Sequence, residues 1–147
     1  STLVESVALF KLQQGSAEEA LALVQRAVAH RQHVSKEAFL RDVTDVTKGF
    51  MDRDMYVFVL DDSGRYLAFG GNPAKVGTRV QDIPGIDGAG LMDAIFKQAS
   101  LEPGWVEYDI ANPTTGRVQS KMSYVQQGDD PDWVVGCGVS STLNSIS

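Results

Sequence analysis

The chain has 147 residues, of which 43% are hydrophobic and 22% are charged, and these values are typical of folded globular domains. Lys and Arg total 13 against 19 Asp and Glu, so the net charge is −6 and no basic cluster favours a nucleic-acid partner. The single Cys137 cannot form an internal disulfide. No apolar run approaches the roughly 18 residues that span a bilayer.

The N-terminal third is predicted to be mainly helical. Residues 1–13 carry a loose helical stripe of apolar side chains. Ser16 and Glu19 have the spacing of a capping box, and the apolar residues after them recur every three or four positions. This pattern predicts an amphipathic helix from Ser16 to about His30.

A second helix is predicted to begin after Ser35, the next N-cap candidate, and to end at Gly49. Because apolar residues again recur at helical spacing, they should share one face of that helix. The predicted apolar face consists of Phe39, Val43, Val46 and Phe50.

Strands are predicted to dominate the rest of the chain. β-branched and aromatic residues alternate with turn residues, which is typical of a hairpin followed by a long loop, a short helix and three more strands. The predicted elements are strands at 55–60 and 65–69, a loop at 70–85, a helix near 90–99, and strands at 105–110, 118–125 and 133–139. Because short turns join neighbouring strands, we predict an α+β fold with N-terminal helices followed by a five-stranded antiparallel sheet with one inserted helix.

Motifs of enzymes and metal sites are missing from the sequence. It contains no Gly-x-Ser-x-Gly elbow, no Walker loop, no His-Glu-x-x-His pair and no Cys-x-x-Cys-His segment. His30 and His33 could share a helix face and hold a metal, but a solvated helix end is the more ordinary interpretation. We therefore predict neither an enzyme nor a bound cofactor or metal.

A binding module fits the strand residues better. Tyr56 and Phe58 share one face of their strand, because side chains alternate along a strand. Lys121 lies in the middle of a predicted strand, where it either points to water or neutralises an anion inside a pocket. Trp105 and Tyr108 fall on opposite faces unless a bulge intervenes.

Residues 54–69 resemble the first hairpin of single Cache domains, which are PAS-like extracytoplasmic sensors of bacterial chemoreceptors and histidine kinases. The similarity covers about residues 15–140, in order and at the spacing of the family. Its further segments are Val76-Gly77-Thr78, Asp87-Gly88, residues 104–108, Asn112-Pro113, residues 121–125 and residues 133–139.

The resemblance implies a sensory domain that binds a small organic ligand, in that family often a short carboxylate, and that regulates chemotaxis or signal transduction as a dimer. It implies a periplasmic or other extracytoplasmic location in an inner-membrane receptor, with membrane attachment only through segments outside this chain. Residues 1–50 would be its helical region and residues 51–147 its PAS-like unit, within one domain. The expected ligand-binding residues are Tyr56, Phe58, Phe69, Trp105, Tyr108 and Lys121.

Two positions depart from the family. Where its second strand commonly ends in Ala-His, this chain has Ala68 and Phe69, and where its last strand commonly ends in Tyr, this chain has Ser140. An apolar ring thereby replaces a polar contact in the expected pocket.

A ligand-free structural or dimerisation module of the same fold is the alternative. It would have its pocket packed solid by Phe69, Met122 and Trp133, whereas a roomy polar pocket would favour the sensor. Small alanines at positions 17, 20, 22, 27 and 29 would let the first helix approach a second copy closely, or simply pack on its own sheet.

Overall fold

The structure is a computed structural model that describes residues 16–53, 55–111, 115–128 and 132–140. The predicted stripe over residues 1–13 lies outside them. The helices are α2 (Ala17–Arg31), α3 (Lys36–Thr44) and α4 (Gly88–Leu101), with the short 3-10 turns η1 (Val46–Lys48), η2 (Pro73–Lys75) and η3 (Val80–Asp82). The strands are β1 (Met51–Asp52), β2 (Met55–Asp61), β3 (Tyr66–Phe69), β4 (Gly104–Ala111), β5 (Val118–Gln127) and β6 (Trp133–Ser140).

The beginning of α2 is fixed by the predicted capping box. Ser16 Oγ accepts a hydrogen bond from the Glu19 backbone N–H, and the Glu19 side chain accepts one from the Ser16 N–H. These bonds satisfy backbone donors that the first turn of a helix leaves unpaired. Val24 and its neighbours Ala20 and Ala27 are buried against the sheet, so the apolar stripe faces the core.

The second helix is shorter than predicted. Ser35 caps α3, as expected, but the helix ends at Thr44, and Val46 is 60% exposed instead of facing the core. The Asp45 side chain accepts hydrogen bonds from the backbone N–H and the hydroxyl of Thr47, which favours a turn over another helical residue. The prediction that Val46 belongs to the apolar face was therefore wrong.

All the strands of the described chain pair antiparallel in one sheet, in the order β1-β2-β6-β5-β4. β3 also pairs with β2, on the edge that β6 does not occupy. The α+β fold and the five predicted strands are confirmed. β1 was not predicted, because two residues are too few to show a strand pattern.

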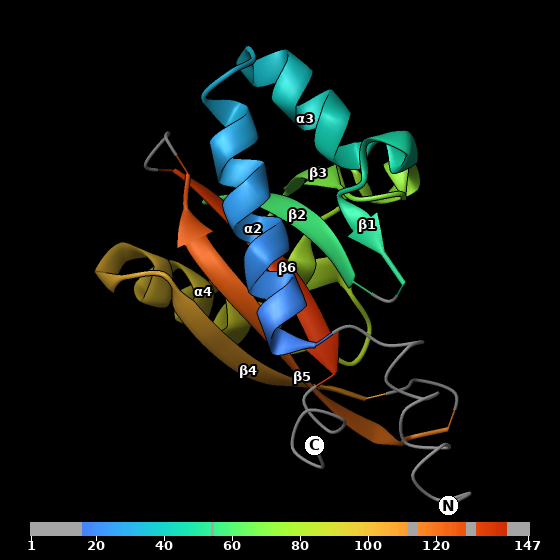
Figure 1. Cartoon of the computed structure of the whole chain (residues 1–147). Helices are drawn as coiled ribbons and strands as arrows, with labels where there is room; N and C mark the ends of the chain where they lie inside the picture. Colours follow the sequence, from blue (N-terminus) through green and yellow to red (C-terminus); the bar gives the residue numbers. More distant parts are fainter. Residues whose placement is uncertain (1–15, 54, 112–114, 129–131, 141–147) are drawn as a thin grey trace, which may run out of the picture.

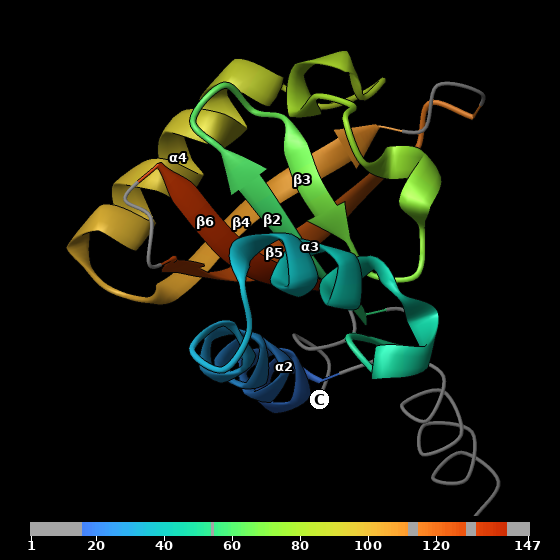
Figure 2. The same cartoon turned by 90° about the horizontal axis from the view of Figure 1, so that it is seen from above.

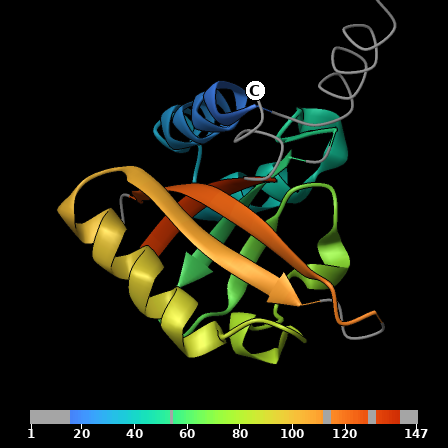
Figure 3. The same cartoon turned by 90° about the horizontal axis from the view of Figure 1, so that it is seen from below.

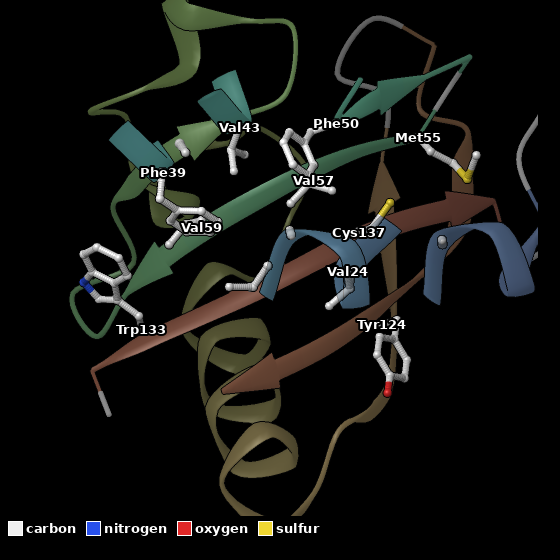
Figure 4. Close-up of a cluster of buried hydrophobic side chains, with 14 of the residues drawn as sticks. Val24, Phe39, Val43, Phe50, Met55, Val57, Val59, Tyr124, Trp133 and Cys137 are labelled. Atoms are coloured by element: carbon white, nitrogen blue, oxygen red, sulfur yellow. The ribbon is translucent and has the colours of Figure 1, made fainter. Parts of the chain in front are cut away.

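The two faces of the sheet are covered by different helices (Figures 2 and 3). We call the side packed against α2 and α3 the α2 face and the opposite side the α4 face. Figure 4 shows the core of the α2 face, which includes Val24, Phe39, Val57 and Cys137. Alternation along each strand sends the intervening side chains to the α4 face, among them Val125 and Val134.

The predicted loop over residues 70–85 is ordered by η2 and η3. Val80 is 1% exposed and belongs to the core of the α4 face, together with Leu91 and Ile95 of α4. The loop and α4 thus enclose this side of the sheet. None of the helices in the described ranges has the length and apolarity that crossing a membrane requires.

Candidate functional site

Five of the six residues predicted from the sequence to bind a ligand lie on the α4 face. Tyr56, Phe58 and Phe69 belong to or pack against the core on that side, and so does Tyr108. Lys121 pairs directly with Tyr108 across β4 and β5, so the two side chains share a face. Strands β2, β3, β4 and β5 therefore bring these residues to the same side of the sheet.

Trp105 is the exception. It packs against the core of the α2 face, where its ring meets Tyr124 edge-on at 5.4 Å between ring centroids. The alternation of β4 is regular, so Trp105 and Tyr108 point to opposite sides, as the sequence pattern predicted.

Aromatic rings from β2 and β3 contact one another on the α4 face. Tyr56 stacks on Phe69 with 4.3 Å between ring centroids, and Tyr66 meets Phe69 edge-on at 5.1 Å and Phe58 at 6.0 Å. Such offset and edge-on arrangements stabilise ring pairs by about 0.5–1.5 kcal/mol beyond their buried area. We call Tyr56, Phe58, Tyr66 and Phe69 the aromatic cluster.

Polar side chains lie on the same face, on β4 and β5. The Tyr108 hydroxyl is 3.2 Å from Ser123 Oγ, within hydrogen-bond distance. Burial raises the pKa of the Tyr108 phenol, although the hydrogen bond with Ser123 opposes that shift, so the hydroxyl keeps its proton at neutral pH. Lys121 is half-buried beside it. We call Tyr108, Lys121 and Ser123 the polar cluster.

Two glycines of β6 form the floor between these clusters. A Cβ atom added to Gly136 would lie 2.5 Å from Phe58 Cζ, so the Phe58 ring covers that position. A Cβ atom added to Gly138 would lie 3.2 Å from Ser123 Oγ and 3.5 Å from the Tyr108 hydroxyl oxygen. Glycine in a strand interior commonly marks a place where another group approaches the backbone closely. At Gly138 the groups that approach are polar.

The sequence reasoning missed Tyr66, Ser123 and the glycine floor. Regular alternation would place Tyr66 and Phe69 on opposite faces, but a bulge between Val59 and Leu60 shifts the register and turns both toward the α4 face. Ser123 is identified as a site residue only when its pairing with Gly138 between β5 and β6 is known. The glycines at alternating positions of the last strand were the one signal that could have been used.

Two cavities in the described part of the chain lie away from the aromatic and polar clusters, and we call them the α3 groove and the α2 cavity. The α3 groove has a volume of about 570 Å³ and is lined by residues that include Leu40, Thr44, Val46, Leu67 and Val76. The α2 cavity has a volume of about 210 Å³ and is lined by residues that include Val28, Arg31, Phe39, Gln127 and Trp133. Neither has a member of the aromatic or polar cluster in its lining.

One of the two histidines considered as metal ligands, His30, has a structural partner instead. His30 Nε2 lies 2.8 Å from Asp42 Oδ2, which joins α2 to α3. Among the described residues no group of three or more His, Cys, Asp or Glu side chains is placed to hold a metal ion.

Comparisons with known proteins agree with this fold. Over 87 residues the chain is 30% identical to the sensor histidine kinase MctS of Rhizobium johnstonii, and the match covers 59% of this chain but only 19% of the kinase. A methyl-accepting chemotaxis protein from Vibrio parahaemolyticus superposes with a TM-score of 0.61 at 22% identity, over 100% of both chains.

A second solved structure, described as the structural basis for carboxylic acid recognition by a Cache chemosensory domain, has a TM-score of 0.58 at 21% identity. It covers 84% of this chain and 92% of its own. The family model of single Cache domain 2 matches residues 5–142. The chain therefore belongs to the single Cache domain 2 family.

Proposed function

We propose that this chain is the extracytoplasmic sensory domain of a bacterial receptor and that it binds a short carboxylate on the α4 face of its sheet. The observation that carries the proposal is the polar cluster above the glycine floor, beside the aromatic cluster. A few polar groups within an apolar lining are typical of small-molecule sites. The description of one structural neighbour as recognising a carboxylic acid supports the same ligand class.

Each cluster has a part in the proposed recognition. Lys121 supplies the positive charge, since a compact ammonium group suits a carboxylate. Tyr108 donates a hydrogen bond from a phenol that stays protonated at neutral pH, and Tyr56 is the second proposed hydroxyl donor. Phe58 and Phe69 form apolar walls against the hydrocarbon part of the ligand. The site needs no cofactor and gives the chain no enzymatic activity.

The positions of the first and last described elements fit a receptor that passes a signal onward. In Figure 1, α2 begins and β6 ends at the same end of the molecule. A ligand between β5, β6 and the aromatic cluster would contact strands that also pack on α2. We propose that the domain serves chemotaxis or a histidine kinase from the periplasmic side of the inner membrane, anchored by segments outside this chain.

A homodimer through the N-terminal helices is part of the proposal. Ala20 and Ala27 pack on the sheet of their own copy, but Ala22 and Ala29 are exposed on the other side of α2. Small side chains permit close approach of a second helix. Sedimentation of the isolated domain at rising concentration should show a monomer–dimer equilibrium, and a monomer at all concentrations would contradict an intrinsic dimer.

One argument for the alternative, a ligand-free module, was that large side chains would fill its pocket. Met122 and Trp133, which would have filled the pocket, pack on the α2 face instead. Of the three side chains invoked for a solid pocket, only Phe69 is on the α4 face.

Calorimetric titration with acetate, propionate, lactate and pyruvate tests the proposal. At least one acid should bind the wild type, and Lys121→Ala should weaken its binding by about 2 kcal/mol, roughly thirtyfold, because the carboxylate loses its charge partner. Lys97→Ala is the matched control, since the Lys97 side chain is 75% exposed on α4, where it pairs with Asp93 at 3.5 Å. Equal affinities for wild type and Lys121→Ala would remove Lys121 from the site, and no heat with any acid would refute the ligand class.

A further inference from the structure

The α2 cavity is larger than ordinary packing leaves open. It lies where α2 and α3 face the end of β5 and the beginning of β6. Folded interiors contain few voids larger than a water molecule. The volume of the cavity, about 210 Å³, is several times the roughly 30 Å³ that one water molecule takes. Because an apolar cavity of about 150 Å³ is enough to bind benzene, this space suits a small molecule built on one benzene ring.

Two buried aromatic rings line the α2 cavity. Phe39 comes from α3 and Trp133 from the start of β6, and both belong to the core of the α2 face (Figure 4). The Lys36 Nζ atom lies 4.8 Å from the centre of the Trp133 ring, and the Trp133 carbonyl accepts a hydrogen bond from the Gly128 N–H. These contacts hold the indole in place. A flat ring that enters the cavity therefore meets preformed aromatic surfaces, on which it can pack offset or edge-on.

A guanidinium group lies at the same cavity. Arg31, the last residue of α2, is half-buried, and its Nη1 donates a hydrogen bond of 2.9 Å to the Val34 carbonyl in the turn before α3. A guanidinium carries five N–H donors in a planar fork, so it can hold a backbone carbonyl and a carboxylate together. Gln32 and Gln127 add amide groups, and none of the described residues that line the cavity is acidic. The lining thus combines one cation with amides and aromatic walls.

We propose that the α2 cavity is a second ligand site and that it takes a single-ring aromatic carboxylate of the size of benzoate. The carboxylate pairs with the Arg31 guanidinium, and the ring packs against Phe39 and Trp133. Such a ligand matches the cavity because one end is anionic and the rest is flat and apolar. The site goes beyond the proposed function, since it lies on the opposite face of the sheet from the polar cluster and shares no lining residue with it.

Fluorescence of Trp133 during titration with benzoate tests the inference. The chain has two tryptophans, so Trp105→Phe leaves Trp133 as the only indole. Benzoate should change its emission in a saturable way, and Arg31→Met in the same background should weaken binding about thirtyfold, because the carboxylate loses its charge partner. Arg41→Met is the matched control and should leave the affinity unchanged, since the Arg41 side chain is 76% exposed and lines the α3 groove. Equal affinity in Arg31→Met and its parent would overturn the inference.

Two analogues of benzoate separate the charge from the ring. Benzamide keeps the flat ring without the negative charge, and cyclohexanecarboxylate keeps the charge without the aromatic ring. Each should bind about tenfold more weakly than benzoate, because each loses one of the two proposed contacts. Benzamide that binds as tightly as benzoate would refute the pairing with Arg31, and cyclohexanecarboxylate that binds as tightly would refute the packing on Phe39 and Trp133.

A variant that fills the cavity gives a readout that does not depend on Arg31. In Val28→Phe the new ring would occupy the space from α2, so benzoate binding should be lost while the melting temperature stays at the wild-type value or rises. Retained benzoate affinity would contradict binding in the α2 cavity, and a melting temperature lower by several degrees would contradict open space there.

The Lys121→Ala variant separates this inference from the proposed function. It should bind benzoate as the wild type does, and a loss of affinity would place benzoate on the α4 face and overturn the inference. Absence of any saturable response to benzoate would also overturn it and would leave the proposed site for short acids intact. Binding of benzoate without binding of any short acid would support the α2 cavity while the proposed function fails.

Discussion

Adding a methyl group to the floor of the site should separate ligand binding from stability. In Gly138→Ala the new Cβ would lie 3.2 Å from Ser123 Oγ, which is tight but can be relieved by a shift of a few tenths of an ångström. The loss of stability should therefore stay below about 1 kcal/mol. The methyl group would occupy the space beside the Tyr108 hydroxyl, and overpacking of a fitted site costs about 1–3 kcal/mol. The affinity for the acid should fall about ten- to a hundredfold.

The neighbouring glycine provides the matched control. In Gly136→Ala the Cβ would lie 2.5 Å from Phe58 Cζ and 2.8 Å from its Cε2. Phe58 is 5% exposed and contacts Tyr56 and Tyr66, so its ring cannot move aside without displacing the aromatic cluster. This variant should lose about 1–3 kcal/mol of stability, and a change of that size lowers the melting temperature by roughly 2–4 °C per kcal/mol in a protein of this length.

Urea unfolding and calorimetry on both variants give the comparison. The expected pattern is a nearly wild-type midpoint with weak binding for Gly138→Ala, and a clearly lower midpoint for Gly136→Ala. Wild-type acid affinity in Gly138→Ala would refute the placement of the ligand beside Tyr108 and Ser123. Wild-type stability in Gly136→Ala would refute the packing of Phe58 on the β6 backbone.

Three further predictions concern stability and access. Burial raises the pKa of Asp61, but hydrogen bonds from Ser63 and Arg65 together outweigh it, so the folded pKa lies below the unfolded value of about 3.9. The stabilisation from these bonds is therefore complete above the unfolded value and is lost as the pH falls through the folded value. Urea midpoints from about pH 6 to about pH 2 should fall less steeply for Asp61→Asn, and identical slopes would contradict this. Ser16→Ala should cost about 1 kcal/mol through loss of the cap, and an unchanged midpoint would count against the capping box. Cys137 is fully buried and should react with thiol reagents only in denaturant, so rapid labelling of the native protein would disprove its burial.

The elements that the sequence predicted are those defined by local signals. Ser16 and Glu19 mark the start of α2 by themselves, and runs of β-branched and aromatic residues between turn residues mark β2, β3, β4, β5 and β6. The end of α3 was missed because it depends on a competition at Asp45 between helical and side-chain hydrogen bonds. β1 was missed because its two residues become a strand only by pairing with β2.

The candidate site was partly predictable for the same reason. The side of the sheet to which Tyr56, Phe58 and Tyr108 point, relative to their neighbours in sequence, follows from alternation along their own strands. Tyr66 needs the bulge in the β2–β3 pairing, and Ser123 needs the β5–β6 register, both of which are set by contacts between strands. A single sequence does not contain those registers, so the places of Tyr66 and Ser123 in the site could not be predicted.

Backbone amide chemical shifts, measured by NMR while the isotope-labelled domain is titrated with lactate and with pyruvate, test the location of the ligand site most directly. The largest shifts should occur at Lys121, Ser123 and Gly138, and they should saturate at the affinity that calorimetry measures. Largest shifts along the α3 groove or around the α2 cavity would place the ligand elsewhere on the chain and contradict a site on the α4 face.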